Sequence, residues 1–140
     1  MRSSRALVAL SLLLFVALLA SPPARAAAPD WNAAAGVQTV EIVTTNEDGT
    51  PRETTIWLAV VDGQGYIRTG NTHWEGNIER NPEVVLRIDR AEYPLRAEFV
   101  QDAALRARIE QVFREKYGFS DEFIGFFRSG DPKIMRLAPR

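Results

Sequence analysis

Hydrophobic and polar residues alternate along most of the chain between residues 36 and 100, and this two-residue period is typical of β-strands with one buried face. Five segments carry the pattern: residues 36–45, 53–62, 65–70, 83–90 and 93–100. Turn sequences separate them, among them Asp48-Gly49 and Asp62-Gly63, which are typical of tight connections between antiparallel strands. The pattern therefore predicts an antiparallel arrangement of strands.

Two of these strands depart from simple alternation. Residues 53–62 are apolar on both faces towards the end of the segment, which predicts a central, buried strand. Residues 93–100 include Pro94, which has no amide hydrogen for a ladder hydrogen bond and therefore favours an edge strand or a bulge.

The hydrophobic period changes after residue 101. Apolar side chains now recur at helical spacing, at Leu105, Ile109, Val112, Phe113 and Tyr117. Asp102 is a suitable N-cap and Gly118 a suitable stop, so a helix is predicted over residues 102–117. A short helix is predicted at residues 120–127 and a last strand at residues 132–139. This order predicts an antiparallel barrel or meander of about six strands in an α+β domain.

The first 26 residues have the pattern of a secretory signal peptide. Two arginines precede an apolar run at residues 6–20, and small residues follow it. The run is shorter than the roughly 20 residues that a membrane-spanning helix needs. We therefore expect cleavage near Ala26 or Ala28, no stable membrane span afterwards, and a periplasmic or secreted protein. Retention as a membrane anchor is the alternative. Residues 37–140 are predicted to form a single domain.

Charge and composition narrow the classes of function. Cleavage would remove three arginines and no acidic residue, which leaves 14 basic against 18 acidic side chains and a net charge of −4. Such a balance does not favour general nucleic-acid binding, and we predict no nucleic-acid partner. The chain has no cysteine, which excludes disulfides, thiol chemistry and cysteine-ligated metals, and we predict no metal site.

The segment GNTHWEGNIERNP, residues 70–82, is a candidate ligand-binding loop. It carries the only histidine, His73, beside Trp74, and it ends in an Asn-Pro turn. An imidazole suits proton transfer, and an indole suits stacking on a flat ligand. An exposed loop histidine, and a tryptophan that plugs the barrel or a dimer interface, are the structural alternatives. No nucleophile elbow, glycine-rich phosphate motif or marked spacing of paired carboxylates occurs in the chain.

Three pieces of the sequence together resemble a known superfamily. They are TIWLAVVDGQGYIRTG (residues 55–70), NIERNPEVVLRI (77–88), and FREKYGF (113–119) with IMRLAPR (134–140). The chain is similar to the split-barrel superfamily of pyridoxamine 5′-phosphate oxidase-like flavoproteins and deazaflavin-dependent reductases, and more closely to a small uncharacterised bacterial branch of it. The resemblance implies a six-stranded antiparallel split β-barrel with a C-terminal helical segment, assembled as a homodimer.

The resemblance also implies a cofactor site. Members that bind FMN or a deazaflavin place it at the dimer interface, with its phosphate on basic and hydroxyl residues at the end of the second strand pair and the start of the next helix. The corresponding candidates here are Arg52, Thr54, Arg68, Thr69, Asn71 and Thr72, with His73 and Trp74 beside them. An arginine fork matches phosphate geometry, and groups at a helix start suit an anion.

Two positions depart from the flavin-binding pattern. Trp74 stands three positions before Asn77, where such members commonly carry a lysine, and Glu75 follows it with a charge that repels phosphate. The only lysines, Lys116 and Lys133, are distant in sequence, so neither is expected near this loop.

Two functions remain open at this point. The one we favour is an exported split-barrel protein of uncharacterised function that binds a small ligand or partner in a degenerate flavin site. The alternative is an oxidoreductase that depends on FMN or a deazaflavin and acts on a small molecule. Flavin binding by the purified protein separates the two.

Overall fold

The computed structural model describes the chain over residues 27–70, 72–118 and 132–140. The expected signal peptide, Asn71 and the expected short helix at residues 120–127 lie outside these ranges. Within them, no helix has both the length and the apolar character that crossing a membrane requires.

Within the described residues, seven β-strands form one antiparallel sheet. They are β1 (Val40–Thr45), β2 (Pro51–Ile56), β3 (Leu58–Val61), β4 (Gln64–Thr69), β5 (Glu83–Ile88), β6 (Ala91–Phe99) and β7 (Lys133–Pro139). Their order across the sheet is β2-β1-β5-β6-β7-β4-β3. Together with the helices, the sheet gives the α+β class that the sequence predicts.

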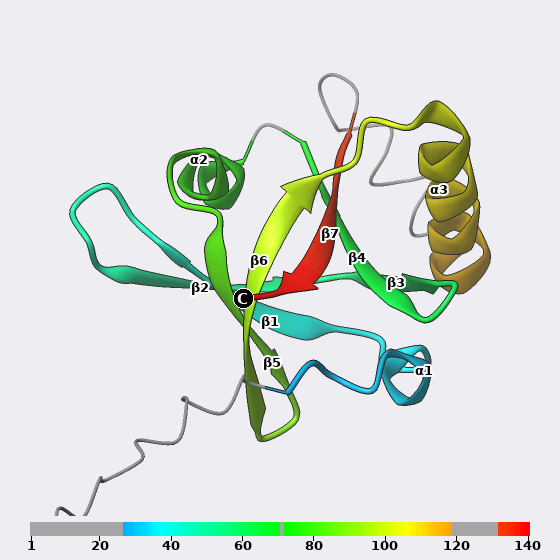
Figure 1. Ribbon diagram of the computed structural model, residues 1–140, viewed down its shortest axis with the longest axis horizontal. Helices are drawn as coiled ribbons and strands as arrows, with labels where there is room; N and C mark the ends of the chain where they lie inside the picture. The colour runs from blue at the N-terminus through cyan, green and yellow to red at the C-terminus, as the bar shows by residue number, and fades with distance from the viewer. Residues whose placement is uncertain (1–26, 71, 119–131) are drawn as a thin grey trace, which may run out of the picture.

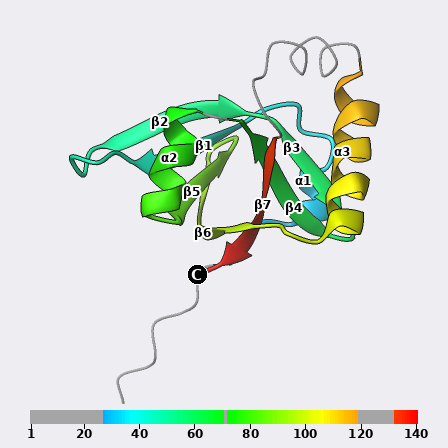
Figure 2. The ribbon, with the colours of Figure 1, turned by 90° about the horizontal axis from the view of Figure 1, so that it is seen from above.

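Strands β2 and β3, which stand at the two ends of this order, are almost consecutive in the chain. Only Trp57 separates β2 from β3, yet β2 pairs with β1 while β3 pairs with β4. The sheet therefore curls until its two edge strands are consecutive in sequence (Figures 1 and 2). The prediction of one strand over residues 53–62 is corrected at Trp57, and the six predicted strands become seven because this one divides.

Helices cover parts of the curled sheet. They are α1 (Trp31–Ala34), α2 (His73–Arg80) and α3 (Ala103–Tyr117). Each begins at a capping side chain, respectively Asp30, Thr72 and Asp102, whose oxygen accepts a hydrogen bond from a backbone amide of the first turn. Helix α3 ends at Gly118, which has a positive φ of 57°, so both predicted limits of this helix are confirmed. Helix α2 packs on β1 and α3 packs on β3.

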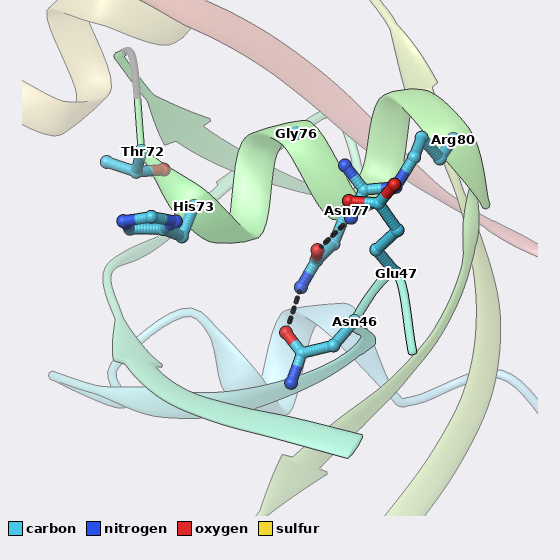
Figure 3. Close-up of a pocket in the computed structure, with 7 residues that line it drawn as sticks. All are labelled: Asn46, Glu47, Thr72, His73, Gly76, Asn77 and Arg80. Carbon is cyan, nitrogen blue, oxygen red and sulfur yellow. Dashed lines mark hydrogen bonds between the residues drawn. The ribbon is translucent and has the colours of Figure 1, made fainter. Parts of the chain in front are cut away.

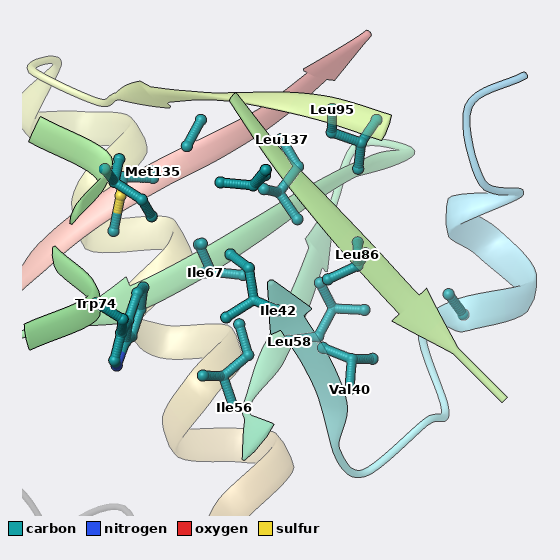
Figure 4. Packing of buried hydrophobic residues seen from close by; sticks show 14 of the residues in the cluster. Val40, Ile42, Ile56, Leu58, Ile67, Trp74, Leu86, Leu95, Met135 and Leu137 are labelled. Atoms are coloured by element: carbon teal, nitrogen blue, oxygen red, sulfur yellow. The ribbon is translucent and has the colours of Figure 1, made fainter. Parts of the chain in front are cut away.

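Two clusters of buried side chains fill the interior. The larger lies inside the curled sheet, where Ile42, Leu58 and Ile67 have no exposed surface (Figure 4). The smaller lies under α3, whose Ile109 and Phe113 pack on the outer side of β3 and β4. Removal of these apolar surfaces from water is the main favourable term in folding. Helix α3 therefore fixes the region around the divided strand.

Pro94 lies in β6, an interior strand, and not on an edge strand as the sequence suggests. Strand β7 ends at Pro139, opposite Leu95, so Pro94 has a strand neighbour only on the β5 side, where it faces Val85. The missing amide hydrogen of Pro94 is tolerated because the sheet has a local edge at this point.

Candidate functional site

The division of the strand at Trp57 leaves an opening in the sheet. The last pair between β3 and β4 joins Leu58 to Ile67, beyond which β2 turns away to pair with β1. Arg68 and Thr69, at the end of β4, are therefore paired on the β7 side only. The opening is a cavity of about 320 Å³, which we call the split cavity. It is lined by Thr55, Ile56, Trp57, Arg68, Thr69, Gly70, Thr72, Trp74 and Phe113.

Aromatic rings give the split cavity apolar walls. Trp57 is half-buried and stacks on Tyr117 of α3, with ring centroids 4.1 Å apart and planes 6° apart. Phe113 is fully buried one turn earlier in α3, 6.0 Å from the ring of Tyr117. Trp74 belongs to the main core and is 7% exposed, so it closes the cavity on the α2 side. Flat, conjugated ligands stack favourably on such surfaces.

The end of α3 holds the strand junction in place. The Tyr117 hydroxyl accepts a hydrogen bond from the Leu58 amide (3.1 Å) and donates one to the carbonyl oxygen of Gln38 (2.8 Å). The Lys116 ammonium donates to the carbonyl oxygens of Val37 (2.6 Å) and Leu58 (2.8 Å). These bonds satisfy backbone groups where the strand divides. Burial lowers the pKa of Lys116 and raises the pKa of Tyr117.

Arg68 reaches the split cavity as half of an ion pair. Its side chain is 4% exposed, and its Nη1 lies 2.5 Å from Oε2 of Glu110 on α3. Its guanidinium carbon lies 4.4 Å from the ring centroid of Phe113, a cation–π contact. The other carboxylate oxygen of Glu110 is buried and has no hydrogen-bond partner among the described residues. Glu110 therefore already neutralises the charge of Arg68.

Two hydroxyl groups connect the split cavity to the start of α2. The Oγ1 atoms of Thr69 and Thr72 lie 2.8 Å apart, within hydrogen-bond distance. Thr72 Oγ1 also accepts the amide of Glu75 at 3.3 Å, as the N-cap of α2. Thr72 lines a second cavity as well, so the two cavities adjoin at this residue.

The second cavity, of about 530 Å³, lies between α2 and the β1–β2 hairpin (Figure 3). We call it the polar groove. It is lined by Asn46, Glu47, Thr72, His73, Gly76, Asn77 and Arg80. Asn77 is 3% exposed and connects its two sides. Its Nδ2 donates to Thr44 Oγ1 (3.0 Å) and Asn46 Oδ1 (2.9 Å), and its Oδ1 accepts from Arg80 Nη2 (2.6 Å).

The structure brings together four of the residues singled out in the sequence. Arg68, Thr69, Thr72 and Trp74 line the split cavity. His73 is exposed and lies in the polar groove beside Thr72.

The other candidates lie elsewhere. Arg52 is exposed on β2 opposite Thr44, and Thr54 is half-buried on β2 opposite Ile42. Neither lines the split cavity or the polar groove. Asn71 is outside the described residues.

Lys133 lies closer to α2 than its sequence position suggests, which corrects the expectation above. Because β7 pairs with β4, Lys133 stands opposite Thr69. Its Nζ lies 2.6 Å from Oε1 of Glu75 and 2.5 Å from Oε1 of Glu79, and the hydrogen bonds to these carboxylates raise the pKa of Lys133. The charge of Glu75, which is 5% exposed, is thus compensated within the fold.

Sequence reasoning missed several residues of the two cavities. Phe113 and Glu110 belong to a helix whose pattern indicates only packing, and nothing in the sequence marks them as neighbours of Arg68. Gly76 and Asn77 gave a clearer signal. A glycine and an asparagine disfavour the middle of a helix, and such residues there point to a close approach or a buried hydrogen-bond network.

The donors present fit some ligands and not others. Among the described residues, no group of three or more histidine, aspartate and glutamate side chains could hold a metal ion. The aromatic walls suit the ring system of a flavin. A phosphate on Arg68 does not fit, because Glu110 lies 2.5 Å from that guanidinium and would repel it.

Solved structures share this architecture. They include the conserved hypothetical protein Rv2991 from Mycobacterium tuberculosis (19% identity, 86% of each chain covered, TM-score 0.63). A putative pyridoxamine 5′-phosphate oxidase from Listeria innocua matches at 17% identity over 74% of this chain and 84% of that chain, with a TM-score of 0.54. An F420-H2-dependent reductase, FDR-A, matches at 16% identity over 72% of this chain and 94% of that chain, with a TM-score of 0.59.

The fold class follows from these likenesses. The chain has the split-barrel fold of pyridoxamine 5′-phosphate oxidase-like and deazaflavin-dependent proteins, which confirms the resemblance seen in the sequence. No curated protein matches the chain significantly.

The chain belongs to the bacterial family described as "Uncharacterized protein conserved in bacteria (DUF2255)", whose sequence profile matches residues 31–129. The match begins at the first residue of α1 and includes every lining residue of the split cavity and the polar groove. The expectation of an uncharacterised bacterial group is thereby confirmed.

Proposed function

We propose that the protein is an exported split-barrel protein that binds a small, flat ligand in the split cavity by stacking. The observation that carries the proposal is the division of the strand at Trp57, which opens the sheet between aromatic walls. Trp57 and Phe113 supply apolar surface, and Thr55, Thr69 and Thr72 supply hydroxyl groups around it. Small-ligand sites commonly combine apolar walls with a few polar groups that set orientation.

The charge at the cavity argues for a ring without a phosphate on Arg68. The Arg68–Glu110 pair carries no net charge, and the Arg68 side chain at the cavity wall is only 4% exposed. A neutral heteroaromatic edge suits this pair better than a phosphate dianion does. The flavin site is degenerate because Arg68 is present but its charge is already paired with that of Glu110.

Export and dimerisation belong to the same proposal. Export rests on the basic, apolar and small-residue segments of the first 26 residues. The homodimer rests on the resemblance, and on the position of the cavity beside β2, at one end of the strand order, where a second copy could complete it. A mature protein that begins after residue 26 or 28, and a solution mass twice that of one chain, are the results expected from mass spectrometry and light scattering.

The central test uses a neutral flat ring as the probe. The protein is expressed with its leader intact, purified, and titrated with lumichrome and with riboflavin while tryptophan and flavin fluorescence are recorded. We expect dissociation constants of tens of micromolar, about 6 kcal/mol of binding free energy. Absence of binding by both probes at about 100 µM, a scale of about 5 kcal/mol, would remove the support for this proposal.

A filled cavity gives the matched control. Thr55 is exposed on β2 and lines the split cavity, whereas Arg52 is exposed on the same strand and does not. Thr55→Trp should weaken riboflavin binding at least tenfold, and Arg52→Trp should leave it within twofold. Equal effects of the two substitutions would place the probe outside the split cavity.

The alternative function is an oxidoreductase that depends on FMN or a deazaflavin. Its specific support is that Arg68, Thr69 and Thr72 meet in one cavity of a fold shared with FDR-A. The test is steady-state oxidation of NADPH or of reduced deazaflavin by protein supplied with FMN in air, where dioxygen reoxidises the reduced FMN. Turnover above that of free flavin, lost in Thr55→Trp and kept in Arg52→Trp, would favour the enzyme over the binding protein.

A further inference from the structure

We infer that the polar groove is the anion-binding half of the ligand site, and that Arg80 contacts a phosphate or carboxylate group on the ligand whose ring occupies the split cavity. The inference rests on the proposed function, because it extends the same ligand past Thr72 into the adjoining cavity. It defines the ligand class as a flat ring that carries an oxyanion on a short polar tail.

Arg80 is held in position for such a contact. It occupies the last turn of α2, where its side chain is exposed, and its Nη2 is fixed at 2.6 Å by Oδ1 of Asn77. Asn77 is itself buried and anchored by hydrogen bonds to Thr44 and Asn46. A guanidinium that is oriented by a buried amide loses little freedom when it binds a planar or tetrahedral oxyanion. Arg80 therefore differs from Arg68, whose partner is a carboxylate.

Gly76 keeps the surface in front of Arg80 open. It lies in the middle of α2, where glycine costs roughly 1 kcal/mol relative to alanine. A Cβ atom at this position would lie 3.8 Å from Nη1 of Arg80, an ordinary van der Waals contact, with nothing else within 4 Å. The fold therefore has room for a methyl group here. An open surface beside the guanidinium is what the glycine provides.

The two cavities are arranged as one elongated site. Thr72 lines both, and its hydroxyl lies 2.8 Å from that of Thr69. Beyond Thr72, the lining changes from aromatic rings to amides, an imidazole and a guanidinium, as Figure 3 shows for the groove. A ligand that bridges Thr72 meets an apolar surface at one end and hydrogen-bond donors at the other.

Glu47 sets the charge balance of the groove. It is exposed in the turn after β1 and lines the same cavity as Arg80. Its carboxylate repels an incoming anion, so the groove binds an oxyanion with only moderate affinity. Removal of this charge should raise that affinity. This gives a substitution whose expected effect is opposite in sign to that of losing Arg80.

The test compares two probes that differ only by a phosphate, riboflavin and FMN, titrated into the full chain by flavin fluorescence. The net charge is −1 for the full chain and −4 without its first 26 residues, so overall electrostatics does not favour the dianion. We expect FMN to bind about tenfold more tightly than riboflavin, a ratio typical of one charge-assisted contact. In Arg80→Gln the ratio should fall to about one, with riboflavin binding unchanged.

Two further variants separate an anion site from a merely structural arginine. Glu47→Gln should raise the affinity for FMN about threefold and leave riboflavin unaffected, since it removes a repulsive charge. Gly76→Ala should raise the thermal midpoint, because alanine favours the helix, and yet weaken FMN about fivefold by occupying the surface beside Arg80. Competition by inorganic phosphate or acetate then shows which oxyanion the groove prefers.

The outcomes are distinguishable from those of the proposed function. Equal binding of riboflavin and FMN would overturn the anion site and leave the ring site standing. A preference for FMN that survives Arg80→Gln would place the phosphate elsewhere and also overturn it. Failure of both probes to bind would overturn the two proposals together.

Discussion

The split cavity and the polar groove meet at Thr72, and they are built in opposite ways. The split cavity is bounded by groups that the core already uses, such as Arg68 paired with Glu110 and Trp57 stacked on Tyr117. The polar groove is bounded by side chains of one short helix and a hairpin, most of them exposed or half-buried. The walls of the first are held by contacts that belong to the core, whereas those of the second are held by a single buried amide, that of Asn77.

This difference bears on what each arginine can do. Arg68 is nearly inaccessible and its charge is paired with that of Glu110, so its removal should mainly lower the free energy of unfolding. Arg80 is exposed and hydrogen-bonded to a neutral amide, so its removal should be felt in ligand affinity. A basic side chain at a predicted site is therefore evidence for anion binding only when no carboxylate of the fold already neutralises it.

Removal of Arg68 should have the largest effect on stability. Arg68→Met leaves the largely buried carboxylate of Glu110 without its partner, and breaking one side of a buried pair costs about 3 kcal/mol. We expect a loss of this size in the free energy of unfolding from urea titration. Retention of wild-type stability would show that Arg68 is not committed to the fold and would restore it as a phosphate ligand.

The double variant Arg68→Met/Glu110→Leu is the control for this prediction. It removes both charges and the buried carboxylate oxygen that has no partner among the described residues. Most of the lost stability should return, because two apolar side chains can replace a desolvated ion pair at little cost. A double variant as unstable as the single one would instead assign the loss to the contact between Arg68 and Phe113.

The sequence predicted the sheet well because its strands pack one face on the core. Alternation alone located β5 and β6, and the period change with Asp102 and Gly118 located α3 to the residue. It could not predict the division at Trp57. No glycine or proline marks that position, and the two halves separate only because they pair with strands that are distant in sequence.

The candidate site could be predicted only where its residues lie close together in sequence. Residues adjacent in sequence, Thr69, Thr72 and Trp74, were found because the resemblance points to one segment. The neutralisation of the charged side chains could not be predicted in this way. Glu110 pairs with Arg68, and Lys133 pairs with Glu75, only because tertiary packing brings them together. Whether a charge near a site is available depends on such contacts, which local pattern does not encode.

Removal of Asn77 should have the next largest effect, and it tests whether the groove depends on one amide. Asn77→Ala deletes the donors to Thr44 and Asn46 and the acceptor for Arg80, and leaves Thr44, 1% exposed, without this partner. We expect a loss of about 2 kcal/mol in urea unfolding. The preference for FMN over riboflavin should also disappear, since Arg80 is no longer oriented.

Asn46→Ala is the matched control, because it removes one of the same hydrogen bonds from the half-buried hairpin side. Its cost should be under about 1 kcal/mol, and the preference for FMN should persist. Loss of riboflavin binding in Asn77→Ala would contradict the separation of the two cavities, because the split cavity contains no side chain that Asn77 holds.

The smallest effect expected is a pH dependence that comes from Lys116 behind the wall of the split cavity. Burial lowers its pKa below the ordinary value of 10.5, although its ammonium donates to Val37 and Leu58. Between the lowered pKa and 10.5 the unfolded chain binds more protons at this residue than the folded one does. The contribution of Lys116 to stability therefore rises as pH increases through this window. It levels off above 10.5 and is lost again as pH falls through the lowered pKa.

Tyr117 changes the stability with pH in the opposite direction, so its contribution has to be removed by comparing two proteins that both contain it. Burial raises its pKa above 10.0, so above that pH the unfolded chain loses its proton first and the stability contribution of Tyr117 falls. Urea unfolding of the wild type and of Lys116→Arg from pH 7 to 10.5 removes this shared trend by difference, because arginine keeps its proton throughout. The difference should shift in favour of the wild type by a few tenths of a kcal/mol, since the amine is partly solvated. A difference that does not change with pH would mean that Lys116 is not desolvated, and that the junction behind Trp57 is open to water.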